Sequence, residues 1–305
     1  MEYKNILVTI GPAIGDCLLS TPIINGLREA YPAANIDTIA QIARTAPGLS
    51  IGYQIIKSYC PHVNHAIEIE ENSNVILKAK AIVQLIMNNY DLIVDIWPNT
   101  RKKTFFSKLI SRGTVAGFDS SYEIYVQPED KHKVDMEHEL LEKITGKKSK
   151  LIYPKFIDSK KKQNIVTLSV SRDDDPLRSW PIERWSEIIN RIHKKYKVDV
   201  LLIGADVNKE RLLNIARGVT DVNRLKASMN QLGLIQKIIS ESKLHLTENG
   251  GIAHLATTTH TPIISVSQSP AGWSPYGKQN IEIRKCFMED IGVEEVWELI
   301  RKKLK

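Results

Sequence analysis

The sequence predicts an α/β protein with two domains, each built on a parallel sheet with helices on both faces. The chain has 305 residues, which is enough for two domains of ordinary size. Short apolar runs alternate with helix-like segments in both halves, and no β-meander interrupts them. A charged, polar stretch at 155–164 separates the halves. We therefore expect domains at 1–157 and 158–305, with the ligand between them at the carboxyl ends of the strands.

A βαβ unit opens the first half. The run 6–10 is apolar and β-branched and stops at Gly11 and Pro12, before a helical pattern and a second strand-like run. The elements expected in this half are strands at 6–10, 36–40, 92–96 and 113–118 and helices at 18–31 and 100–113. In the second half we expect strands at 165–170, 198–203, 244–246 and 262–266 and helices at 181–196, 208–217, 232–240 and 293–304.

Composition and charge narrow the class of protein. Hydrophobic residues make up 42% of the chain and charged residues 25%, as in soluble globular proteins. No apolar run reaches the ~18 residues of a membrane span, and the N-terminus leads straight into a strand, so we expect no secretory signal. The net charge of +7 fits a lysine-rich solvated surface or an anionic partner. Because no helix-turn-helix, zinc-finger or RNP-type motif is present, we expect no nucleic-acid partner.

The cysteines indicate the redox environment. Cys17, Cys60 and Cys286 are far apart and odd in number, so they predict neither a metal site nor a disulfide framework. A reducing cytoplasm is the expected location.

The loop after the first strand carries a candidate catalytic acid. Gly15 and Asp16 follow Gly11 at the carboxyl end of that strand, on the side of the expected cleft. A carboxylate at a helix start often caps the helix or complements its dipole. The alternative is that Asp16 acts as a general base.

Two loops of the second half carry groups that suit a diphosphate. Ser169 and Ser171 follow a strand, and Arg178 precedes a helix that opens at Pro181. The alternative is a polar loop with Trp180 as a packing anchor. The three aspartates at 173–175 point in different directions and have no further ligand at a suitable spacing, so we expect no metal site.

The segment 247–256 combines a strand end, two glycines and a helix start. Gly250 and Gly251 let the backbone approach a ligand, and the free N–H groups of the helix favour a phosphate. Asn249 and His254 flank them, and His254 is either a semi-buried packing residue or a ligand contact. After an earlier strand, Glu210 is either a helix-capping acid or a ligand for ribose hydroxyls.

A basic amphipathic helix is expected after Thr100. It carries Arg101, Lys102 and Lys103, and no acid occurs between Thr100 and Gly113. Such a helix either presents its cations to solvent or uses them to bind an anionic partner. That partner would be an anionic acceptor or the headgroup layer of a membrane.

Taken in order, these segments resemble glycosyltransferase family 9, the ADP-heptose:lipopolysaccharide heptosyltransferases. The resemblance covers nearly the whole chain. In the first half, the residues that match the family pattern are Ile6-Leu7-Val8, Gly15-Asp16, Leu18-Leu19, Thr21-Pro22 and Ala30-Tyr31-Pro32. In the second half they are Arg178-Ser179-Trp180-Pro181 with Trp185, Gly251, His254-Leu255-Ala256, Pro262, Pro275, Cys286-Phe287-Met288, Ile291 and Val296.

The resemblance implies a GT-B fold, in which two Rossmann-like domains face a central cleft. The first domain would bind the acceptor, through Gly15 and the 101–103 cations, and the second would bind the nucleotide sugar; the closing helix is an element that could pack back on the first domain. It also implies an inverting, metal-independent transfer without a cofactor, with Asp16 as general base. Donor contacts would come from the following residues: Ser169, Ser171, Arg178, Glu210, Asn249, Gly250, Gly251 and His254.

Two departures from the family pattern lie on the donor side. Asn249 stands where the family usually has Asp, so an acidic group is lost or has moved to Glu248. Arg178 stands for the usual Lys, which keeps the charge and adds a planar fork.

The resemblance implies heptose transfer from ADP-heptose to a lipopolysaccharide-core or related anionic glycan acceptor. The expected location is the cytoplasm, with peripheral contact at the cytoplasmic face of the inner membrane as an option. The alternatives are transfer from another nucleotide sugar, a nucleotide-sugar epimerase on the same fold, and a binding protein without turnover, which the Asn249 departure keeps open.

Overall fold

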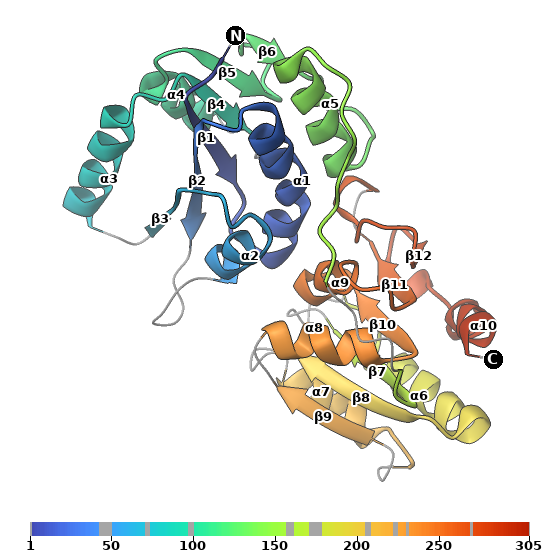
Figure 1. The fold of residues 1–305 in the computed structure, drawn as a ribbon. Coiled ribbons are helices and arrows are strands. Elements are labelled where there is room, and N and C mark those ends of the chain that lie inside the picture. Colours follow the sequence, from blue (N-terminus) through green and yellow to red (C-terminus); the bar gives the residue numbers. More distant parts are fainter. Residues whose placement is uncertain are drawn as a thin grey trace. The chain divides into compact units, whose positions relative to one another are not determined.

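Figure 1 shows the computed structural model of the chain, which forms two compact units, Met1–Pro154 and Lys155–Lys305. The division lies three residues before the boundary expected at 157/158. The residues that the structure describes are 2–42, 51–70, 74–96, 101–156, 162–170, 179–204, 209–221, 225–229, 232–268 and 271–304.

The first unit is a parallel sheet with the strand order β3-β2-β1-β4-β5-β6. Its helix α1 packs against α2 and α5, and α3 packs against α4 on the other face of the sheet (Figure 1). The strands are β1 (Asn5–Ile10), β2 (Asn35–Ile42), β3 (His65–Glu70), β4 (Leu92–Asp95), β5 (Thr114–Gly117) and β6 (Ile124–Tyr125). The helices are α1 (Ile14–Ala30), α2 (Ile51–Tyr59), α3 (Val75–Met87), α4 (Arg101–Ile110) and α5 (Lys133–Thr145).

The second unit repeats this topology, with the strand order β12-β11-β10-β7-β8-β9 and parallel pairing throughout. Its strands are β7 (Ile165–Ser169), β8 (Asp199–Gly204), β9 (Leu225–Met229), β10 (Leu244–Glu248), β11 (Ile263–Ser267) and β12 (Asn280–Arg284). Its helices are α6 (Ile182–Tyr196), α7 (Lys209–Arg217), α8 (Leu232–Glu241), α9 (Gly251–Ala256) and α10 (Val293–Lys303).

In both sheets the strand order reverses next to the first strand of the unit. The reversal lies between β1 and β4 in the first unit and between β7 and β10 in the second. In open parallel sheets, ligands bind outside the carboxyl ends of the strands at such a switch point. The topology therefore singles out the loops that follow these four strands.

The core of the second unit explains why its strands are recognisable in the sequence. Residues such as Val166, Leu168 and Leu246 are fully buried, because helices cover both faces of the sheet. The closing helix α10 contacts α6, and its buried Val296 and Ile300 belong to the same core. The apolar face of α10 is therefore directed into its own unit.

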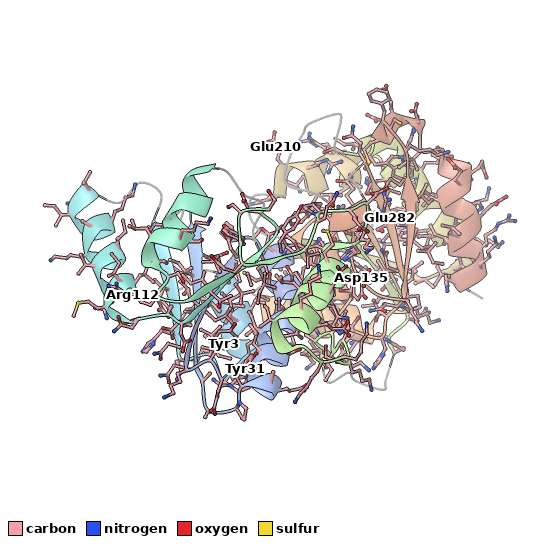
Figure 2. All side chains as sticks on the ribbon, turned by 90° about the horizontal axis from the view of Figure 1, so that it is seen from above. Tyr3, Tyr31, Arg112, Asp135, Glu210 and Glu282 are labelled. Atoms are coloured by element: carbon pink, nitrogen blue, oxygen red, sulfur yellow. The ribbon has the colours of Figure 1, made fainter. Side chains whose placement is uncertain are left out.

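Helix α1 packs closely against helix α5. Gly26 permits this approach, since a Cβ atom there would overlap the Cδ2 atom of Leu141. At the far end, the Tyr31 hydroxyl donates to the carbonyl of Ile144 at 3.3 Å. Tyr31 also packs edge-on against Tyr3, with 5.4 Å between ring centroids (Figure 2). The C-terminal ends of α1 and α5 therefore have fixed positions against each other.

Candidate functional site

Asp16 lies in the first turn of α1, three residues after the helix N-cap at Ala13. The main-chain N–H of Ala13 donates to Oδ2 of Asp16 at 3.3 Å. The carboxylate thus makes the capping contact considered from the sequence. Its side chain is only partly exposed, at the carboxyl end of β1. Its role as a general base stays a prediction.

The surroundings of Asp16 shift its proton affinity. Burial raises the pKa of the carboxyl group above its ordinary value, while the charge of Lys133 and the Ala13 N–H oppose that rise. A carboxylate with a raised pKa accepts protons more readily at neutral pH. The local environment is therefore compatible with a base as well as with a cap.

Asp95 is a buried carboxylate that the sequence arguments missed. It ends β4, directly opposite Thr9 of β1, at the switch point of the first sheet. Its carboxylate accepts hydrogen bonds from the hydroxyls of Thr9 at 2.5 Å, Ser107 at 3.0 Å and Tyr122 at 2.6 Å. These contacts join β1, β4 and α4, so Asp95 holds these elements in place around the candidate site. No pattern in the sequence pairs a strand end with hydroxyls so far along the chain.

Residues 101–103 lie in helix α4, as expected. The side chains of Arg101, Lys102 and Lys103 lie outside the described part of the chain. Their assignment to acceptor binding, like that of the buried Gly15, stays a prediction.

In the second unit, Glu248 ends β10 and holds the surrounding elements together. Its buried carboxylate forms a two-point ion pair with Arg211 of α7. It also accepts hydrogen bonds from the Trp180 main-chain N–H at 3.1 Å and from Nε1 of Trp185 at 2.9 Å. Glu248 therefore has a structural role. This role argues against the idea that Glu248 replaces a ligand-binding acid at position 249.

Trp180 anchors the loop before α6. Its side chain is fully buried and packs edge-on against Trp185, with 4.6 Å between ring centroids. Its indole Nε1 donates to the carbonyl of Ile291 at 2.9 Å. The packing role considered for this residue is confirmed, and it sets where the preceding loop emerges.

The turn from β10 to α9 has the strand-to-helix geometry expected from the sequence. Gly250 is the N-cap of α9 in an extended conformation, and Gly251 begins the helix. The side-chain amide of Asn249 donates to the carbonyl of Trp273 at 3.3 Å. His254 is buried, and its main-chain N–H donates to the carbonyl of Gly250. The donor contacts assigned to these residues stay predictions.

One face of the second sheet carries a buried polar row. Ser169 contributes to it, with its hydroxyl 3.2 Å from Nε2 of His245 and 2.8 Å from the Thr247 hydroxyl. The other ring nitrogen of His245 lies 2.9 Å from the Thr167 hydroxyl. Burial lowers the pKa of His245 to about 3, so its ring is neutral at physiological pH. Ser169 thus has partners inside the sheet, while its donor contact stays a prediction.

Two other expected donor contacts, Ser171 and Arg178, lie outside the described residues. The aspartates at 173–175, where no metal site is expected, also lie outside them. Glu210 is exposed in the first turn of α7 (Figure 2). The donor contacts that the family resemblance implies for Ser171, Arg178 and Glu210 stay predictions.

Within the described segments, no group of three or more His, Cys, Asp and Glu side chains is placed to hold a metal ion. None of the helices described has the length and apolar character to cross a bilayer. Cys17 and Cys60 are buried and Cys286 is exposed, and all three are free thiols.

Comparisons with known proteins bear on this geometry. A model of glycosyltransferase family 9 (heptosyltransferase) matches residues 79–292. The lipopolysaccharide core heptosyltransferase OpsX of Haemophilus influenzae is 27% identical over 127 residues, which are 40% of this chain. The matched stretch spans 35% of that curated relative, about a third of its length.

Two solved structures share the fold over the whole chain. A glycosyl transferase family 9 protein from Veillonella parvula superposes with a TM-score of 0.77 at 16% identity, covering 100% of this chain and 98% of that one. The ADP-heptose lps heptosyltransferase II of E. coli gives 0.75 at 18% identity, with coverage of 100% and 98%. These likenesses confirm the expected GT-B class of two parallel-sheet α/β domains.

Proposed function

The chain belongs to glycosyltransferase family 9, the heptosyltransferase family, and from this membership we propose that it transfers heptose from ADP-heptose to a lipopolysaccharide-core acceptor. The names of the relatives support the choice of donor and acceptor, since one is an ADP-heptose lps enzyme and another a lipopolysaccharide core enzyme. Transfer is favoured over the epimerase alternative by the family match and by the placement of Asp16 at the start of α1.

The observation that carries the mechanism is the partly exposed Asp16 carboxylate at the carboxyl end of β1. In the proposed reaction, this carboxylate removes the proton from an acceptor hydroxyl. The acceptor oxygen then forms a bond to the anomeric carbon of heptose, while the bond from that carbon to the ADP oxygen breaks. ADP leaves with the bonding electron pair, and the configuration at the anomeric carbon inverts. The burial that raises the pKa of Asp16 suits it for this proton transfer.

On the donor side, we propose that fixed protein charges and dipoles stabilise the departing ADP without a metal. The candidate groups are Arg178, Ser171 and the main-chain N–H groups near Gly250 and Gly251, with Glu210 at the ribose. Preorganised donors of this kind stabilise developing charge without rearranging during the reaction. No separate cofactor is required in this scheme.

Nucleotide selectivity tests the proposed donor. Calorimetric binding of ADP, UDP, GDP and CDP in the presence of EDTA should show selective binding of ADP. Preference for UDP or GDP would keep the transferase class but redirect the search to another nucleotide sugar. Absence of binding by all four would favour a binding protein without turnover, and a requirement for added Mg²⁺ would contradict the metal-free scheme.

We further propose that the first unit touches the anionic cytoplasmic face of the inner membrane, where a glycolipid acceptor would be presented. Apolar side chains lie exposed on the solvent side of α3: Val75 (80%), Ile76 (64%), Val83 (54%) and Met87 (66%). Leu109 of the adjoining α4 is 54% exposed. Neither α3 nor α4 contains an acidic residue, and both carry lysines. Exposed apolar groups beside cations are typical of surfaces that bind anionic lipid.

A further inference from the structure

A buried ion pair on α5 lies beside the start of α1. Lys133 and Glu137 are one helical turn apart, and 2% and 0% of their surfaces are exposed. The ammonium group of Lys133 contacts Oε1 of Glu137 and lies 3.4 Å from the hydroxyl of Ser20. That hydroxyl donates to the main-chain carbonyl of Asp16 at 2.9 Å. A chain of contacts therefore runs from α5 to the residue proposed as the base.

Stability alone is a poor explanation for this pair. Moving two charges out of water costs several kcal/mol per ion, and well-packed apolar residues of similar volume often stabilise a fold as well or better. Oε2 of Glu137 has no hydrogen-bond partner among the described residues, so the carboxylate depends on Lys133. The pair places a positive charge inside the protein, close to the start of α1.

That charge acts on Asp16. Burial raises the pKa of Asp16, and the positive charge of Lys133 is the larger of the two effects that oppose the rise. Burial lowers the pKa of Lys133 to about 7, while the negative charge of Asp16 opposes this fall and Oε1 of Glu137 contacts the ammonium group. The other titratable neighbours are Cys17, whose thiol pKa is raised by burial, and Glu68, whose charge acts on Cys17.

We infer that Lys133, held by Glu137, is a positioning residue that keeps the carboxylate of Asp16 ionised for the removal of the acceptor proton. This inference rests on the proposed role of Asp16 as the base. Lys133 itself is buried and touches neither substrate nor the reacting atoms. Glu137 limits the effect, because its negative charge partly cancels the field of the ammonium group.

The inference is tested by titrating Asp16 directly. The carboxyl carbons of aspartate are labelled with ¹³C, and the Asp16 signal is assigned by its loss in Asp16→Asn. Two variants are compared, Glu137→Gln and the double variant Lys133→Met/Glu137→Gln, since they differ only in the charge of Lys133. We expect the Asp16 midpoint of the double variant to lie about one pH unit above that of Glu137→Gln. We also expect Glu137→Gln to lie below wild type.

Two controls complete the design. Lys131→Met removes an exposed cation two residues away and should leave the Asp16 midpoint unchanged. If the double variant fails to fold, Lys133→Gln/Glu137→Gln takes its place in the comparison with Glu137→Gln, because a change at Glu137 alone shifts the Asp16 midpoint through the charge of Glu137 itself. Equal midpoints in all folded variants would overturn the inference.

A kinetic measurement connects the titration to transfer. The acid limb of the pH profile of kcat/KM should move with the Asp16 midpoint, about tenfold in rate for each unit below the limb. Lack of transfer by wild type with ADP-heptose would refute the proposed function while the titration still tests the coupling. Normal transfer with unmoved midpoints would refute the inference alone.

Discussion

The carboxylate of Glu248 and the guanidinium of Arg211 form a two-point ion pair inside the second unit, with 2.5 Å between Oε2 and Nη1 and 2.7 Å between Oε1 and Nη2. The same guanidinium donates to the carbonyl of Trp180 at 2.8 Å. Because this carbonyl belongs to the loop that leads into α6, the pair fixes β10, α7 and that loop together. It lies at the end of β10, one residue before the Asn249 departure.

We expect Glu248→Ala to lower the free energy of unfolding by about 3–5 kcal/mol, because it leaves the Arg211 charge buried without its partner. The measurement is urea unfolding followed by tryptophan fluorescence. The double variant Arg211→Met/Glu248→Met should lose less than the sum of the single variants Arg211→Met and Glu248→Met, since it leaves no unpaired charge. Glu187→Ala provides the matched control, because its ion pair with Arg191 is at the surface and should contribute under ~1 kcal/mol.

His245 predicts a loss of stability at acid pH. Burial lowers its pKa to about 3 in the folded chain, against about 6.5 for an unperturbed histidine. The unfolded chain therefore binds the extra proton first as the pH falls. The contribution of the neutral His245 ring to the free energy of unfolding is fully present above pH 6.5. It is lost between about pH 6.5 and 3, by up to ~1.4 kcal/mol per pH unit.

Urea unfolding at intervals from pH 7.5 to 4.5 measures this loss. We expect the free energy of unfolding to fall less steeply with decreasing pH in His245→Gln than in wild type. His260→Gln, at an exposed position, should keep the wild-type slope. Identical slopes in wild type and His245→Gln would show that the buried ring is not the source.

The α3 surface predicts binding to anionic lipid. Sedimentation with vesicles of phosphatidylglycerol and phosphatidylethanolamine should retain wild type more strongly than vesicles of phosphatidylcholine, and salt should weaken the binding. Val83→Glu/Met87→Glu should reduce the bound fraction several-fold. Leu213→Glu, which charges a 50% exposed apolar position on α7, should not. Equal loss in both variants would assign the effect to net charge rather than to this surface.

The sequence predicted best those elements that are buried on both faces. The strands β1, β4, β7 and β10 lie inside their sheets and form short continuous apolar runs, so their positions could be inferred within a few residues. The edge strand β12 was missed, because Asn280–Arg284 alternates polar and apolar residues and faces less of the core.

Helix α5 shows why part of the candidate site was also missed. Its core-facing positions include Lys133 and Glu137 together with Leu140 and Leu141, so the charged pair interrupts the apolar period of the helix. The two charges pair with each other one helical turn apart, but only the folded chain buries this pair and brings Ser20 of α1 to Lys133. The same holds for Asp95, whose three hydroxyl donors come from distant segments.

The most direct test of the central claim is the rate of heptose transfer from ADP-heptose by Asp16→Asn, measured beside its affinity for ADP. Asparagine keeps the capping geometry of α1 but cannot accept the acceptor proton, so kcat/KM should fall by about 10²–10⁴ while the Kd for ADP changes little. Asp135→Asn, an exposed first-turn acid of α5, should retain wild-type transfer. Transfer at the wild-type rate by Asp16→Asn would contradict the assignment of Asp16 as the base.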